Sequence, residues 1–159
     1  MGDSPLKLAG FKPSDVKYFI VPETGRTVEE EMRSAATRMV DYIQEGINDY
    51  YASYSPVVYK RTHQLKYSVL YSDIGSVKYS SRKAMITIEP NYWIWHNSLP
   101  FGGRGHVSNV FKLIDAGWFV LNGSHAYIYR FGWYEGFGFM RSAIDKFNSN
   151  NPLGIEVKY

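Results

Sequence analysis

The chain has 159 residues, of which 45% are hydrophobic and 21% are charged, as in a globular domain rather than a disordered chain. This length is enough for one domain with its own core. The absence of cysteine excludes disulfides, thiol nucleophiles and thiolate metal sites. No apolar run approaches the ~20 residues of a membrane span, and the first residues lack the apolar core of a signal peptide. We therefore expect a soluble intracellular protein, or one assembled inside a cell, with no membrane partner.

The net charge of +3 is a weak indication of nucleic-acid binding. The aromatic content of 17% is more informative. Aromatic side chains fill cores, and tyrosine and tryptophan are also enriched where protein surfaces meet. Composition therefore leaves two alternatives open, a dense core or a surface hidden against partner proteins.

Prolines and glycines are spread through residues 1–26 and oppose regular structure there, apart from a strand-like run from Val16 to Val21. We predict an extended N-terminal arm over residues 1–26, ordered by a neighbouring subunit. Residues 27–159 are predicted to form a single α+β domain.

A long helix is predicted to begin at Thr27. Thr27 and Glu30 have the spacing of a capping box, and apolar residues then recur every three or four positions as far as Tyr50. Gly46 weakens the helix locally, and Pro56 ends it. The spacing therefore predicts a long amphipathic helix.

Strand and helix patterns follow this helix. Residues 76–79 and 84–89 flank a polar turn and predict a hairpin, and residues 126–131 and 155–159 predict two further strands. A second amphipathic helix is predicted from four apolar residues, Phe137, Met140, Ile144 and Phe147. The fold class predicted is α+β, with a long N-terminal amphipathic helix and a C-terminal helix packed on a largely antiparallel β-sheet.

Charge is segregated along the chain. The long helix is acidic, the segment after it is basic, and residues 92–134 combine few charges with many glycines and every tryptophan. The composition of residues 92–134 is typical of the centre of a protein interface. Burial of these residues in the protein's own core is an equally weighted alternative. The tryptophans selected as interface candidates are Trp93, Trp95 and Trp118.

No catalytic motif is present. The four histidines lack the spacing of a helical zinc site, and there is no nucleophile elbow, P-loop or dinucleotide-binding fingerprint. We expect no enzymatic activity, no catalytic residue, no cofactor and no metal site.

The basic segment has two interpretations. Its candidate residues are Lys60, Lys78, Arg82 and Lys83. With the tyrosines between them they could contact phosphates and stack on bases, or they could pair with the acidic helix of a neighbouring subunit. We favour pairing.

One segment after the long helix is more specific. Residues 54–65, YSPVVYKRTHQL, contain Tyr54, Pro56, Tyr59, Arg61 and Thr62. A helix followed by Tyr-x-Pro-x-x-Tyr-x-Arg-Thr and a leucine, with a short C-terminal helix, resembles the tail-completion, or head–tail joining, family of tailed bacteriophages, which is related to the minor tail protein Z group. The chain departs from this family at His63, where glycine is common. The five motif residues are interface candidates.

The resemblance implies a non-enzymatic virion structural protein that completes the tail or joins head and tail. It implies a homo-oligomeric ring, six-fold by family resemblance, between head connector or stopper proteins and tail terminator or tail tube proteins. DNA in the channel would be contacted without sequence specificity. The expected location is the neck of the virion, after assembly in the host cytoplasm. The alternatives are a tail terminator or other neck ring protein and, from a different class, a small basic nucleic-acid-binding protein.

Overall fold

The computed structural model describes residues 13–53, 64–80, 83–91, 94–96, 106–108, 110–120 and 132–159. These residues form helices and two-stranded antiparallel ladders, so the fold is mixed α+β, as predicted. The chain divides into two compact units. We call Met1–Val40 with Leu70–Glu89 the hairpin unit, and Asp41–Val69 with Pro90–Tyr159 the helix-pair unit. That residues 27–159 form a single domain stays a prediction.

The α-helices are α2 (Val28–Ser53), α3 (Val110–Ala116) and α4 (Phe139–Ser149), and the 3-10 helices are η1 (Pro13–Tyr18), η2 (Gln64–Ser68) and η3 (Tyr71–Asp73). The strands are β1 (Lys78–Tyr79), β2 (Ala84–Met85), β3 (Ile94–His96), β4 (His106–Ser108), β5 (Gly117–Val120) and β6 (Gly132–Glu135). They pair as β1–β2, β3–β4 and β5–β6, each antiparallel. No helix among the described residues is long and apolar enough to span a membrane.

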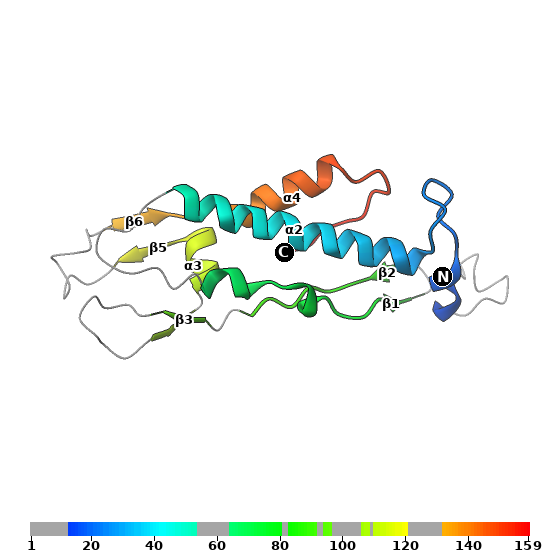
Figure 1. Ribbon diagram of the computed structural model, residues 1–159, viewed down its shortest axis with the longest axis horizontal. Coiled ribbons are helices and arrows are strands. Elements are labelled where there is room, and N and C mark those ends of the chain that lie inside the picture. Colours follow the sequence, from blue (N-terminus) through cyan, green and yellow to red (C-terminus); the bar gives the residue numbers. More distant parts are fainter. Residues whose placement is uncertain are drawn as a thin grey trace, which may run out of the picture. The chain divides into compact units, whose positions relative to one another are not determined.

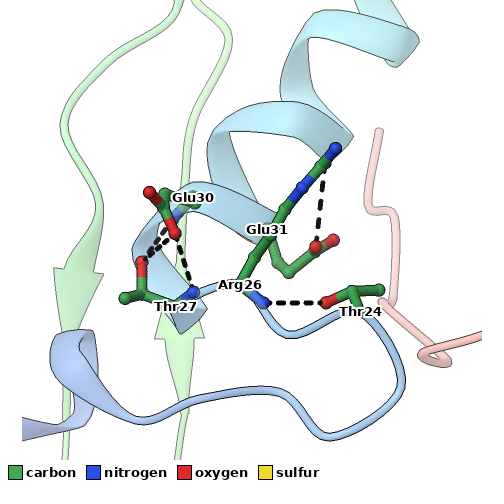
Figure 2. A network of polar contacts seen from close by, with 5 residues as sticks. All are labelled: Thr24, Arg26, Thr27, Glu30 and Glu31. Atoms are coloured by element: carbon green, nitrogen blue, oxygen red, sulfur yellow. Dashed lines mark hydrogen bonds and ion pairs between the residues drawn. The ribbon is translucent and has the colours of Figure 1, made fainter.

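The helix α2 begins at the capping box that the sequence predicts. The Thr27 backbone N–H donates to Glu30 Oε2 at 2.8 Å, and the Glu30 N–H donates to Thr27 Oγ1 at 3.2 Å (Figure 2). Each bond satisfies a backbone donor that the first helical turn leaves without an intrahelical partner. The buried apolar residues of α2 recur along one stripe, namely Ala35, Ala36, Met39, Val40, Ile43 and Ile47.

In the hairpin unit, β1 and β2 form the predicted hairpin beside the first half of α2 (Figure 1). Lys78 lies opposite Met85 and Tyr79 opposite Ala84. The ladder is shorter than predicted, because beyond it only the Ile74–Ile88 pair forms a further bridge. The hairpin prediction is therefore confirmed in place and in pairing, with shorter strands.

The strand predicted from Val16 to Val21 is wrong. The 3-10 helix η1 occupies residues as far as Tyr18, and only Ile20 forms a bridge, with Thr27. Pro13 explains the difference, because its fixed φ suits the first position of a helical turn. The described part of the predicted arm thus contains a helical turn that lies against β1. Ordering of residues 1–26 by a neighbour stays a prediction.

In the helix-pair unit, α4 lies on the second half of α2 (Figure 1). A Cβ on Gly46 would lie only 2.8 Å from Phe139 Cβ, so the missing side chain permits the close approach. The Phe139 ring meets Phe111 edge-on, with centroids 4.9 Å apart. Lys146 Nζ lies 2.7 Å from Glu45 Oε1 at the surface beside this contact.

The apolar stripe predicted for the C-terminal helix is partly wrong. The buried residues of α4 are Phe139, Met140, Ala143 and Phe147. Phe137 precedes the helix and is 42% exposed, although its ring meets Tyr50 edge-on at 5.5 Å. Gly138, the residue before α4, has a left-handed φ of +72°, so Phe137 lies outside the helix, whereas Met140 and Phe147 are buried as predicted.

A buried carboxylate joins α3, α4 and the last residue of the chain. Asp115 Oδ1 accepts the Met140 N–H at 2.8 Å, and Asp115 Oδ2 accepts the Tyr159 hydroxyl at 3.2 Å. The first bond satisfies a donor in the first turn of α4, where the helix dipole also favours negative charge. The Asp115 side chain therefore connects the start of α4 to Tyr159 within the helix-pair unit.

The strand predicted over residues 155–159 is also wrong, because these residues form no strand. Asn151 Oδ1 accepts the Ile155 N–H at 3.0 Å, and Asn151 Nδ2 donates to Ile155 O at 2.7 Å. These bonds occupy backbone groups that a strand ladder would use. The predicted alternation of buried and exposed side chains is nevertheless present, since Ile155 and Val157 are half-buried and their neighbours are exposed. The strand predicted at 126–131 lies outside the described residues.

Candidate interaction surface

One side of the hairpin carries exposed polar and basic side chains. Residues opposite each other across an antiparallel ladder share a face. Lys78 therefore shares a face with Met85, and Ser80 shares it with Lys83, whose carbonyl accepts the Ser80 N–H at 2.9 Å. These four residues and Ser76 are all exposed, and we call them the basic hairpin face.

The opposite side of the hairpin faces α2. Its four residues Val77, Tyr79, Ala84 and Ile86 are all half-buried. The Tyr79 hydroxyl donates to Glu29 Oε2 at 3.4 Å. Burial raises the pKa of Tyr79, and the Glu29 carboxylate raises it further, so the hydroxyl stays protonated and remains a donor at neutral pH. This contact fixes which side of the hairpin is exposed.

The acids in the first turn of α2 have partners in the hairpin unit itself. Arg33 Nη2 lies 3.3 Å from Glu29 Oε1. Figure 2 shows the second pair, in which Arg26 Nη1 lies 3.8 Å from the buried Glu31 Oε1. Hydrogen bonds from the Thr27 backbone and then its side chain lower the pKa of Glu30. A neighbouring subunit would have to compete with these contacts to use the same carboxylates.

The two lysines of the basic hairpin face, Lys78 and Lys83, differ from these acids in their lack of ion-pair partners within the described structure. Among the described residues, neither Lys78 nor Lys83 has an ion-pair partner. Both side chains are exposed, and the ladder holds their backbones on adjacent strands. The hairpin therefore presents two ammonium groups together on one face.

Exposed apolar side chains are found in the same unit. They are Tyr18, Ile20, Leu70, Tyr71 and Met85. Lys17 Nζ lies 4.4 Å from the centroid of the Tyr18 ring, and a hydrogen bond to the Tyr18 side chain raises the pKa of Lys17. Exposed apolar groups among cations are typical of a surface that meets another protein, and stacking on nucleic-acid bases uses the same residue types.

Most predicted site residues lie outside the described residues, namely Tyr54, Pro56, Tyr59, Lys60, Arg61, Thr62, Arg82 and Trp93. The backbone places Trp95 opposite Val107 in β3–β4, and Trp118 opposite Tyr134 in β5–β6, so these two tryptophans belong to different ladders. Of the predicted residues, the described structure brings together Lys78 and Lys83.

The sequence predictions did not include Met85, which belongs to the basic hairpin face. They also did not include Lys17 and Tyr18, which lie outside that face, since Lys17 interacts electrostatically with Glu29 and Tyr79. Met85 could have been found from the hairpin, because a register with Ser80 opposite Lys83 also places Met85 opposite Lys78. No local signal distinguishes Lys17 or Tyr18, because their position depends on η1 lying against β1.

Within the described parts of the chain, no group of three or more His, Cys, Asp or Glu residues could hold a metal ion. Comparisons with protein-family models, with curated proteins and with solved structures gave no match. The described residues define the class of a mixed α+β protein with an exposed basic hairpin face.

Proposed function

We propose that the protein is a structural subunit of a tailed-bacteriophage virion, which forms a ring at the neck and completes the tail or joins head and tail. The sequence supports this through residues 54–65, which resemble the head–tail joining family. That segment begins directly after α2 ends at Ser53, as the resemblance requires. The ring is six-fold by family resemblance, with connector or stopper proteins on one side and tail terminator or tube proteins on the other.

The observation that carries the proposal is the difference in pairing between the acids and the lysines of the hairpin unit. Closed rings are built from heterologous contacts, in which one surface meets a different surface of the next copy. In the hairpin unit, Glu29 and Glu31 lie beside Arg33 and Arg26, whereas Lys78 and Lys83 are exposed and have no ion-pair partner among the described residues. Such a face suits one half of a heterologous contact.

The finer architecture is also a proposal. We infer that α2 and α4 pack on a largely antiparallel sheet in the assembled protein. The three described ladders are all antiparallel and have two strands each, so their edges carry backbone groups available for further pairing. Slow amide exchange along both strands of each ladder after assembly is the expected result. Exchange at the monomer's rate would contradict a completed sheet.

Electron microscopy of phage particles, with the protein located by a label, tests the proposed location. We expect label at the head–tail junction, and its position within the neck separates a head–tail joining protein from a tail terminator. Particles without any label would contradict a virion role. The control is a label on a capsid protein, which must decorate the head alone.

Nucleic-acid binding is the second candidate, favoured by the two exposed lysines and the exposed Tyr18 ring. For duplex DNA, the logarithm of the binding constant falls linearly with the logarithm of the salt concentration. The slope is about −0.9 for each phosphate that the protein neutralises. Replacing Lys78 and Lys83 by glutamine would then reduce this slope by about 1.8. A salt-independent interaction, or none, would contradict this function.

A further inference from the structure

We propose that residues 155–159 of one copy of the chain bind, as an added parallel β-strand, to the hairpin of a second copy. The receiving segment is residues 84–88, which includes β2 and the Ile88 bridge. The inference rests on the proposed function, because it names a contact through which copies join in the ring. This contact is heterologous, as a closed ring requires, since two different segments of the chain meet.

The receiving segment has hydrogen bonds to the first half of the hairpin. Lys83 O, just before the segment, accepts the Ser80 N–H, and Thr87 O accepts the Gly75 N–H, each at 2.9 Å. Backbone groups alternate in direction along a strand of an antiparallel pair. The alternation directs the other backbone groups of the segment to the opposite edge, which we call the open edge, and these belong to Ala84, Ile86 and Ile88.

The open edge has no partner in the described structure. Among the described residues, neither Ile86 nor Ile88 makes a backbone hydrogen bond, and the bonds of the Ile74–Ile88 bridge belong to the flanking residues. Pro90 has no N–H, so the row of donors along this edge ends at Ile88. An unpaired strand edge is a template on which another chain can form a further strand.

Residues 155–159 have the side-chain pattern of a strand but no partner strand. Ile155 and Val157 are half-buried, whereas Glu156 and Lys158 are exposed. The backbone N–H and carbonyl groups of Glu156 and Lys158 make no hydrogen bond within the described structure. These groups are therefore available to a second chain.

Contacts at both ends hold this segment in place. The Ile155 N–H donates to Asn151 Oδ1, and Asn151 Nδ2 donates to Ile155 O. At the other end, the Tyr159 hydroxyl donates to the buried Asp115 carboxylate. A segment that is positioned before binding loses less conformational entropy when it binds. The backbone groups between the two ends are thus presented at a low entropic cost.

The free backbone groups of the two segments match in a parallel arrangement. In a parallel pair, each residue bonds to the two residues that flank the one opposite it. With Val157 opposite Ile86, the Ile86 N–H would donate to Glu156 O, and Ile86 O would accept the Lys158 N–H. An antiparallel strand at this position would instead use the backbone of Ile155, whose N–H and carbonyl are already bonded within its own copy.

The exposed charges favour the same orientation. In the parallel register, Glu156 becomes a diagonal neighbour of Lys83, and Lys158 becomes a diagonal neighbour of Glu89, positions within reach of long side chains. An antiparallel strand would bring like charges together instead. Lys158 Nζ lies 3.4 Å from Glu156 Oε1 within one copy, but both side chains are largely exposed, so this pair is weak and competes little.

Hydrogen exchange of the full chain, measured residue by residue at several protein concentrations, tests the register. The amides of Glu156 and Lys158 should exchange at least roughly ten-fold more slowly once the chain associates, because both would donate to the open edge. The Val157 amide lies between them and points away from that edge, so its rate should not change. Slowing at Val157 alone would indicate an antiparallel strand and would contradict the proposal.

Charge exchange, read by sedimentation at several protein concentrations, tests the partner. Glu156→Lys with Lys158→Glu leaves the net charge unchanged and should raise the dissociation constant of self-association roughly ten-fold, since two attractive pairs become repulsive. Lys83→Glu with Glu89→Lys should have a similar effect. Combining all four substitutions should restore the wild-type value within about three-fold.

The matched control is Arg141→Glu with Asp145→Arg, which exchanges two exposed opposite charges on α4. Its dissociation constant should stay within about two-fold of the wild type, because exposed charges outside the contact contribute little. Unchanged far-ultraviolet circular dichroism in every variant excludes unfolding as the cause.

The backbone contribution is tested at Lys158. Lys158→Pro removes the N–H that would donate to Ile86 O, whereas Lys158→Ala removes the same side chain and keeps the N–H. The proline variant should self-associate roughly five-fold more weakly than the alanine variant, as expected for one net hydrogen bond. Equal dissociation constants would contradict strand addition.

Three further outcomes would overturn the inference. They are a wild-type protein that stays monomeric at all concentrations, protection of Glu156 and Lys158 that does not depend on concentration, and a four-fold variant that is not restored. Labelling at the neck tests the proposed function separately, because a ring built through other surfaces would still occupy that position.

Discussion

The two units of the chain differ in what they bury and what they leave exposed. The described core of the helix-pair unit includes Phe111, Phe139 and Phe147, whereas that of the hairpin unit consists of Ala35, Ala36, Met39 and Val40. Among the described residues, both units expose large apolar side chains, which include Tyr18 and Met85 in the hairpin unit and Tyr67 and Tyr159 in the helix-pair unit. The units therefore differ in their buried aromatic side chains, which in the described residues belong to the helix-pair unit, and α2 contributes to both cores.

The largest expected effect is on the aromatic core of the helix-pair unit. Phe139→Ala should lower the free energy of unfolding by about 3–5 kcal/mol, because Phe139 is fully buried and its loss leaves a cavity against Phe111. Phe137→Ala is the matched control, since Phe137 is 42% exposed, and it should cost less than about 1 kcal/mol. Equal losses in urea unfolding would show that the core does not lie where the burial places it.

A smaller effect is expected at the buried carboxylate of the same unit. Asp115→Ala should cost about 1–3 kcal/mol, because the Met140 N–H at the start of α4 loses its acceptor. Tyr159→Phe removes the other bond and should cost about 0.5–1.5 kcal/mol. If Tyr159→Phe proved the more destabilising in thermal unfolding, Asp115 would not be acting chiefly on the start of α4.

In the hairpin unit, substitution of Thr27 should have a still smaller effect on the free energy of unfolding. Thr27→Ala should cost about 1 kcal/mol, because it removes the side-chain acceptor of the Glu30 N–H in the first turn of α2. Thr24→Ala is a suitable control, since Thr24 Oγ1 accepts the longer hydrogen bond from the Arg26 N–H at 3.4 Å, before α2 begins. Amide exchange at residues 28–31 should accelerate in the Thr27 variant and stay at the wild-type rate in the control.

The smallest effect concerns pH. The contacts from Thr27 lower the pKa of Glu30 below the ordinary value of 4.5. A carboxylate with a lowered pKa stabilises the folded state above its unfolded pKa, and that contribution is lost as pH falls through the folded pKa. Stability between pH 5 and pH 2 should therefore fall less steeply in Glu30→Gln than in the wild type. Identical slopes in unfolding titrations would contradict the assigned contact.

The features that could be predicted from the sequence are those determined by residues close together along the chain. Thr27 and Glu30 are three residues apart, and the hairpin turn brings together residues that are close in sequence, so both features follow from short-range patterns. Errors arose where one residue changed the local backbone. Gly138 shifted the start of α4, and the Asn151 side chain took the backbone groups of Ile155.

The candidate site was predictable in part. The exposure of Lys78 and Lys83 follows from the hairpin pattern, and the Arg33–Glu29 pair has the four-residue spacing expected on a helix. The contact of Tyr79 with Glu29 joins residues 50 positions apart, and periodicity carries no information about such contacts. The side of the hairpin that faces α2 therefore required the structure.

Gly46 has a consequence for the order in which parts of the helix-pair unit open. Glycine inside a helix costs roughly 1 kcal/mol relative to alanine, so the last turns of α2 are weaker alone than with α4 seated on them. Separation of α4 and fraying of residues 47–53 should then occur as one cooperative event. Amides in both segments would report the same opening free energy, while those in the first turns of α2 would report a different one.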